Sequence, residues 1–296
     1  MIEEERDYLV GLIELVEKAK ALEKSYKKSM RDFAQSEIIW EKFLSHIPGI
    51  GNVLAAKLIV KLPCERYRNV SALWRHCGLH LVCPVCTEKV KIKDKKGIEA
   101  IKILPVLANG EGICPKCKRR GVSPVRRSGK NIDYTPNRRT FVWNIGESLI
   151  KQKSPIYYDL YAQEKERQAG RRFAKGELKE ISEPLYAKEK SNPYKYGDVA
   201  LKKDHAHKRA MRKMVKIFLQ HYWVVYRLLA KLPVSTPYVQ GKIGHVDIVT
   251  WEDVMRANGQ NPEDVLKEIK EAEKAAEAAK VAEQPEKKKD AKADAA

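Results

Sequence analysis

The chain has 296 residues, which suits one large domain or two small ones with extensions. Its formal net charge at pH 7 is +19, and an excess of this size favours a polyanionic partner. No apolar run is long enough to cross a bilayer and no signal-peptide pattern opens the chain, so the sequence argues against a membrane protein.

The positive charge is concentrated in the middle of the chain. Residues 1–45 carry 8 Lys and Arg against 10 Asp and Glu, and residues 263–296 carry the same numbers. Residues 46–262 therefore carry 42 basic against 19 acidic side chains, a net charge of +23. A surface rich in both Lys and Glu, as in thermophiles, would be roughly balanced. The middle is thus the candidate polyanion-binding region.

Residues 1–45 are predicted to form a long helix. Apolar residues recur there at steps of three, four or seven, with charged residues between them, at Leu9, Leu12, Val16, Ala19, Tyr26, Met30 and Phe33. One such stripe is compatible with a coiled coil that joins copies of the chain in a homo-oligomer. The alternative is a helix that packs on its own domain.

A glycine-containing turn follows, with the sequence Ile-Pro-Gly-Ile-Gly at 47–51. A second helix is expected over 53–62, so the pattern is that of a helix-hairpin-helix element. Gly49 and Gly51 would allow backbone N–H groups to approach a phosphate at the start of the second helix. The alternative is an ordinary turn between packed helices.

Further helices are expected later in the chain. A short one is predicted over 68–81 and a longer one over 139–168, followed by a polar stretch at 169–203 that we expect to be loop with short helical pieces. Residues 205–232 have a broad apolar face. Thr250 to Asp253 is typical of a helix start and Asn258-Gly259 of its end. Another helix begins at Asn261-Pro262 and leads into an Ala/Glu/Lys-rich tail.

Two CxxC pairs, Cys83 with Cys86 and Cys114 with Cys117, predict a structural zinc site. Each pair can place two thiolates on one ion, and four thiolates complete a tetrahedral site. Two strands at 89–93 and 101–104 would complete a zinc ribbon over 83–117. Thiol redox chemistry is the competing use of CxxC, and His76 and His80 are possible substitute ligands. Cys77 is interpreted as a core residue, and Cys64 has no assigned role.

A strongly basic segment, 118–139, follows the second pair. Its candidate nucleic-acid-binding side chains are Arg119, Arg120, Arg126, Arg127, Lys130, Arg138 and Arg139. Ser128 lies among these bases, where its hydroxyl could hydrogen-bond a phosphate or attack one. Composition alone does not separate these two roles.

Four ordered blocks resemble one known family. They are residues 47–51, Ala72 to Leu79, Pro124 to Lys130, and Asn137 to Arg139. In this order they resemble the C-terminal transposase domain of the insertion-sequence one-ten family, the DEDD-type recombinases guided by a bridge RNA. The resemblance covers roughly residues 43–150. In this sequence a zinc-ribbon insertion separates the second and third blocks.

The resemblance implies a role for several residues. Ser128 falls on the serine that the family uses as nucleophile in strand exchange, and Gly49 and Gly51 fall on its DNA-contacting hairpin. Residues 1–45 take the place of the family's coiled coil. The family's metal-binding carboxylates belong to a RuvC-like domain that this sequence lacks ahead of the helix. We therefore expect Mg²⁺ only if a separate RuvC-like subunit supplies the site.

Together these patterns predict a mainly α fold. A long coiled-coil-like helix at 1–45 precedes a helical DNA-binding domain at 46–232, which contains the helix-hairpin-helix and the inserted small β zinc ribbon. A short segment at 233–262 and a partly disordered tail at 263–296 complete the chain.

Three functions are open. The first is a cytoplasmic, nucleoid-associated DNA-binding protein derived from or part of a transposase, which also binds structured RNA if a guide is used. The second is a zinc-ribbon RNA- or chromatin-binding factor without recombination activity. The third is an enzyme that cleaves DNA through Ser128 unaided.

Overall fold

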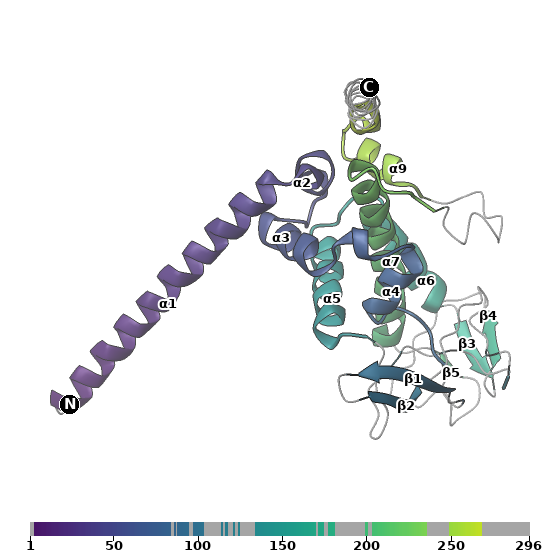
Figure 1. Ribbon diagram of the computed structural model, residues 1–296, viewed down its shortest axis with the longest axis horizontal. Coiled ribbons are helices and arrows are strands. Elements are labelled where there is room, and N and C mark those ends of the chain that lie inside the picture. The colour runs from purple at the N-terminus through teal and green to yellow at the C-terminus, as the bar shows by residue number, and fades with distance from the viewer. Residues whose placement is uncertain are drawn as a thin grey trace, which may run out of the picture.

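A computed structural model describes the protein at residues 3–83, 86, 88–94, 97–103, 114, 116–117, 121, 124, 134–169, 171–174, 177–180, 199–200, 203–235 and 249–267. The described part is mainly helical, as the sequence predicts. One long helix projects from a body of packed helices, and short strands lie at one end of that body (Figure 1).

Helix α1 (Glu3–Ser36) extends away from the body, with the N-terminus at its far end (Figure 1). Most of its apolar stripe is exposed, including Leu9 at 48% and Tyr26 at 62%, and only its last turns pack on the body, where Ala34 is fully buried. The prediction that residues 1–45 form one helix is therefore wrong at its C-terminal end. The chain turns at Glu37, which has extended backbone angles.

The turn after α1 leads into two short elements, α2 (Ile38–Lys42) and the 3-10 helix η1 (Leu44–His46). Three large side chains explain this change of direction, because Ile39, Phe43 and Leu44 are each no more than 2% exposed in the core. A straight continuation of α1 would leave these apolar groups in water. Burial of apolar surface therefore decides where the long helix ends.

Two helices follow the glycine turn. Helix α3 (Asn52–Lys61) buries Ala55, Ala56, Leu58 and Ile59 on one face. A 3-10 turn η2 (Cys64–Arg66) joins it to α4 (Val70–His76). The α4 start is fixed by Asn69, whose side-chain oxygen accepts a hydrogen bond from the Ala72 N–H at 2.9 Å.

The single helix predicted over 139–168 is two helices, α5 (Pro136–Lys151) and α6 (Tyr157–Ala169). Pro155 lies in the break, where it has no N–H to continue the helical hydrogen bonds. Lys153 and Ile156, on either side, have positive φ angles of 45° and 65°. The break allows α6 to reverse and pack along the next helix.

Helix α7 (Lys203–Leu229) lies at the centre of the body, where α4, α5 and α6 pack around it (Figure 1). The broad apolar face predicted for this region is confirmed. Its buried side chains include Met211, Met214, Val215, Phe218, Leu219, Tyr222 and Val225. Gly146 allows α5 to approach α7 closely, because a Cβ at this position would lie 2.7 Å from a methyl carbon of Val215.

The C-terminal described segment also packs on α7. Helix α9 (Trp251–Ala257) begins with a capping box in which Thr250 and Asp253 satisfy each other's backbone N–H groups. Residues 262–267 begin another helix, and Val265 is only 2% exposed. The predicted tail at 263–296 thus starts with a packed turn, and its remainder lies outside the described residues.

In the described part of the chain, five strands form two small sheets. Strands β1 (Glu88–Asp94) and β2 (Gly97–Ile103) pair antiparallel, with Val90 opposite Ile101. Strands β3 (Arg171–Ala174), β4 (Glu177–Glu180) and β5 (Val199–Ala200) form a sheet in the order β4-β3-β5. The second sheet lies where the sequence predicts loop and short helical pieces.

Candidate metal centre and nucleic-acid interface

The four cysteines of the two CxxC pairs form one cluster. The ligand atoms of Cys83, Cys86, Cys114 and Cys117 all lie within 4.8 Å of one another. The Cys83 and Cys117 Sγ atoms are 3.4 Å apart, and those of Cys86 and Cys114 are 3.9 Å apart. Four thiolates at about 2.3 Å from one zinc ion would be about 3.8 Å from each other. The cluster therefore has the dimensions of a tetrahedral metal site.

The local geometry of the first pair also suits a metal. The Cys86 N–H points to the Cys83 Sγ at 3.3 Å, so the backbone supports one thiolate from within the pair. Hydrogen bonds with the Cys117 and Cys83 thiols raise the pKa of Cys86 to about 12. Four sulfurs this close do not ionise together without a cation, and a divalent ion would supply the compensating charge. The cluster could thus hold a metal such as zinc.

The other candidate ligands have different partners. His76 Nδ1 is 2.6 Å from the Tyr67 hydroxyl, and its Nε2 is 2.8 Å from an Arg138 nitrogen. His80 is buried and its ring makes an edge contact with Tyr134. Cys77 lies in the hydrophobic core, where burial raises the pKa of its thiol to about 12. Cys64 is also fully buried in that core.

The two glycines of the turn before α3 have different surroundings. Gly49 has a φ of 99°, and a Cβ there would lie 3.0 Å from the Ser148 carbonyl oxygen of α5. The Ser148 hydroxyl donates to the Gly49 carbonyl at 2.6 Å. Gly51 is exposed, with nothing within 4 Å of a Cβ, and it caps α3 without a side-chain hydrogen bond. Gly49 is therefore packed against α5, while Gly51 is exposed at the start of α3.

Two of the predicted nucleic-acid-binding arginines make internal contacts. Arg138 donates from Nε to the Lys61 carbonyl at 3.1 Å, besides its contact with His76. Arg139 donates to the Pro124 carbonyl, and its guanidinium lies 5.3 Å from the centre of the Tyr134 ring. Both side chains thus join the start of α5 to neighbouring segments.

The rest of the predicted basic site lies outside the described residues. This applies to Ser128 and to Arg119, Arg120, Arg126, Arg127 and Lys130. The structure therefore brings together the four cysteines, and it places Gly49, Gly51, Arg138 and Arg139 around the ends of α3 and α5.

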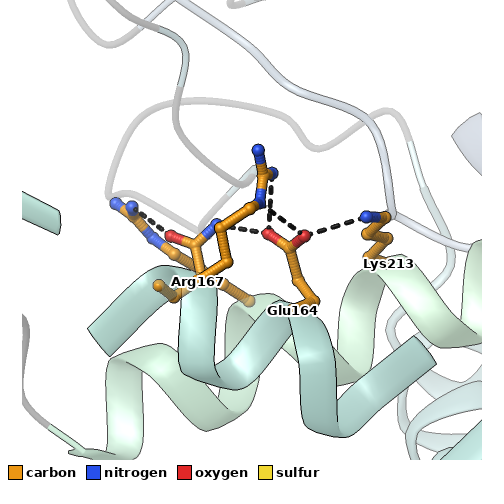
Figure 2. Close-up of polar contacts among 5 residues, drawn as sticks. Glu164, Arg167 and Lys213 are labelled. Carbon is orange, nitrogen blue, oxygen red and sulfur yellow. Dashed lines mark hydrogen bonds and ion pairs between the residues drawn. The ribbon is translucent and has the colours of Figure 1, made fainter. Parts of the chain in front are cut away.

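A second polar cluster, which no sequence pattern singles out, joins α6 to α7. The carboxylate of Glu164 accepts two hydrogen bonds of 3.0 Å from Arg167 and one of 2.9 Å from Lys213 (Figure 2). Gln168 also donates to this carboxylate, and its own oxygen accepts from Arg209 at 3.3 Å. Burial alone would raise the pKa of Glu164, but these donors outweigh it and hold the pKa at about 2.

The buried His221 of α7 has a hydrogen-bond partner at each ring nitrogen. His221 is 2% exposed, with Nδ1 2.9 Å from the Tyr157 hydroxyl and Nε2 3.0 Å from the Val249 carbonyl. Burial lowers the pKa of His221 to about 4, so the ring is neutral at physiological pH. Its neutral form supplies the donor and the acceptor that these two contacts need.

Among the described residues, no helix is both long and apolar enough to cross a membrane. Comparison with known proteins found no matching family model, no matching curated protein and no matching solved structure.

Proposed function

We propose that this chain is a DNA-binding protein derived from or part of an insertion-sequence transposase, and that its four-cysteine cluster holds a structural zinc ion. The observation that carries the proposal is the excess of positive charge, +23 over residues 46–262, in a region that also contains a cysteine cluster of metal-site dimensions. A strongly basic region with a zinc-binding module is typical of proteins that neutralise nucleic-acid phosphates.

Zinc is the metal that best suits the cluster. Thiolates are soft ligands, and a set of four at tetrahedral spacing favours Zn²⁺ or an iron–sulfur centre over Mg²⁺ or Ca²⁺. Cys83 and Cys114 are buried and the other two half-buried, as in a closed structural site. In the proposal the β1–β2 hairpin, which lies between the two pairs in the sequence, completes a zinc ribbon with the cluster.

The accessible start of α3 is the proposed helix-hairpin-helix contact. Gly51 is exposed and, among the described residues, no side chain caps α3, so in the proposal the first N–H groups of this helix donate to an oxyanion. The positive end of the helix dipole adds to the attraction for a phosphate. Gly49 contributes indirectly, because its contact with α5 fixes the turn that positions Gly51.

We propose that a second copy of the chain covers the apolar stripe of α1. Leu9, Leu12, Val16 and Ala19 are spaced by alternating steps of three and four, which is the a and d pattern of a coiled coil. These side chains do not reach the body, and a stripe of this kind is complementary to itself. Ion pairs Glu14–Lys18 and Glu23–Lys27 lie along the same helix.

Recombination chemistry would require a base or a metal ion in addition to the arginines of this chain. Ser128 takes the nucleophile's role in the resembling family, and its hydroxyl needs a base or metal to remove the proton. In the proposal a RuvC-like domain supplies the Mg²⁺-binding carboxylates, and the residues of the present sequence bind and position the nucleic acid. The zinc-loaded chain alone then binds DNA without cleaving it.

The test is a binding competition with purified, zinc-loaded protein. Duplex DNA, single-stranded DNA and a structured RNA of matched charge compete for the protein at about 150 mM salt. The proposal expects duplex DNA to bind and no covalent serine–DNA adduct to form. A protein that binds only RNA would instead be the alternative factor without recombination activity. An adduct abolished by Ser128→Ala would show unaided cleavage.

A further inference from the structure

The cluster around Glu164 contains more positive charge than the single carboxylate neutralises. One buried carboxylate requires one positive partner, but Arg167 and Lys213 both bind Glu164 directly, and Arg209 joins through Gln168. Arg167, Lys213 and the Glu164 carboxylate, which the two ion pairs join directly, sum to a charge of +1. These two cations therefore carry one positive charge that Glu164 does not neutralise.

Arg167 and Lys213 have more donor N–H groups than the Glu164 carboxylate can accept. A carboxylate has about four acceptor sites, and Arg167, Lys213 and Gln168 supply four donors to it. Those contacts use two of about five N–H groups on Arg167 and one of about three on Lys213. In the described part of the chain, Glu164 is thus saturated while both cations keep donors for another acceptor.

The donor groups of Arg167 and Lys213 lie at the protein surface. The Glu164 side chain is only 4% exposed, whereas Arg167 is 53% and Lys213 49% exposed. Figure 2 shows the carboxylate between the two cations, with Arg167 reaching back over α6 and Lys213 coming from α7. The buried carboxylate therefore holds two half-exposed cations in fixed positions, which lowers the entropy lost when they bind an anion.

The surrounding sequence adds to the positive field. Residues 203–216 of α7 carry six Lys and Arg and one Asp. Of these, Lys216 is turned inward, with its ammonium 4.1 Å from the centre of the Trp74 ring. On α6 the nearest acid to Glu164 is Glu166, which lies two residues on and therefore about 200° around the helix.

We propose that Arg167 and Lys213, ordered by Glu164, form a phosphate-contacting surface for the backbone of a nucleic acid. Polynucleotide phosphates suit it because a guanidinium binds them through paired N–H groups and an ammonium binds them as a point charge. The inference rests on the proposed function, and adds a contact surface remote in sequence from the basic segment 118–139. It concerns phosphates only and so carries no sequence preference.

The variants must avoid leaving a buried carboxylate without a partner. Glu164→Gln serves as the reference background, because it removes the carboxylate and keeps both cations. Arg167→Gln and Lys213→Gln are then added together. The matched control adds Lys24→Gln and Lys28→Gln to the same background, which removes the same charge from exposed positions on α1. Circular dichroism and thermal melting establish that each variant folds.

Affinity is measured by fluorescence anisotropy with duplex DNA and duplex RNA of one sequence, over a series of salt concentrations. Loss of both cations should weaken binding by about tenfold or more, and should reduce the slope of log K against log salt by about two. The control pair should change affinity less than about twofold. Unequal effects on DNA and RNA identify the duplex that this surface contacts.

A second readout needs no variant. Nucleic acid should slow the chemical acetylation of Lys213 in the wild-type protein, followed by mass spectrometry, and leave Lys18 unchanged. If the wild-type protein binds tightly, but the double substitution leaves affinity unchanged and nucleic acid leaves the acetylation rate of Lys213 unchanged, this surface is excluded while the proposed function stands. If the wild-type protein binds no nucleic acid at all, the proposed function itself fails.

Discussion

The Ser148 hydroxyl of α5 donates a hydrogen bond of 2.6 Å to the Gly49 carbonyl, which fixes the glycine turn against the middle of the body. A residue with a side chain at position 49 would bring its Cβ to 3.0 Å from the Ser148 carbonyl oxygen. The turn that presents the start of α3 is therefore held by packing, and only Gly51 beside it remains open to solvent.

Substitution of the two glycines separates packing from binding. Gly49→Ala should lower the free energy of unfolding by about 1 to 3 kcal/mol. Alanine is strained at the positive φ of this position, and its methyl group would lie too close to the Ser148 carbonyl of α5. Gly51→Ala, at a φ of −85° and in open space, should change stability by less than about 0.5 kcal/mol. Chemical denaturation measures both.

The same pair tests the helix-hairpin-helix proposal. If the start of α3 contacts a phosphate, Gly51→Ala should fold normally and bind duplex DNA more weakly, because a methyl group now stands beside the first N–H groups. Equal affinity of wild type and Gly51→Ala would show that the turn only connects packed helices.

Metal content tests whether the four-cysteine cluster binds zinc. The wild-type chain should carry about one zinc ion, measured by elemental mass spectrometry. Cys114→Ser should lose it, and its melting temperature should fall because metal binding contributes directly to folding. Cys77→Ala removes a core thiol outside the cluster and should keep the zinc. Zinc retained by Cys114→Ser, or absent from the wild type, would contradict the assignment.

Buried His221 predicts a loss of stability on acidification. Its pKa is about 4 in the folded chain and about 6.5 when unfolded, so the unfolded state takes up the proton first. The free energy of unfolding should fall by up to about 3 kcal/mol as the pH drops from about 6.5 to 4. Below about pH 4 His221 is protonated in both states, so its contribution should change no further.

Denaturation of His221→Gln over the same pH range measures this contribution. The variant should be less stable at neutral pH but should lose less stability on acidification. A wild-type profile in His221→Gln would show that other groups cause the acid sensitivity.

Oligomeric state tests the role of α1. Leu12→Glu with Val16→Glu places charges on the exposed stripe and should raise the dimer dissociation constant by about a hundredfold or more, without affecting the body. Val10→Glu changes a residue that is 54% exposed on another face, and should leave the dimer intact. Sedimentation equilibrium distinguishes these outcomes, and a wild type that is monomeric at micromolar concentration would exclude the coiled coil.

Local patterns in the sequence predict much of this fold. The apolar face of α7 and the cap at Thr250 are visible as spacing and residue type, and the CxxC pairs identify the four clustered cysteines. The end of α1 at Ser36 is not visible in this way, because it depends on where Ile39 and Phe43 find a core. The break between α5 and α6 has a sequence signal in Pro155, which the periodicity of the surrounding residues obscures.

The polar contacts between helices are the least predictable part. Glu164, Arg167 and Gln168 are a familiar i, i+3, i+4 group on α6, but their approach to Lys213 depends on how α6 and α7 align. Arg138 and Arg139 are likewise typical phosphate-binding residues in the sequence, yet both have internal partners. Charge indicates what a region can bind, and only packing decides which cations remain exposed.

The salt dependence of DNA binding tests the central claim most directly. If zinc-loaded protein neutralises about six phosphates, raising salt from about 50 to 200 mM should weaken its affinity for a duplex by about a thousandfold. An affinity that does not change with salt, or no binding at about 50 mM, would contradict a phosphate-binding basic core.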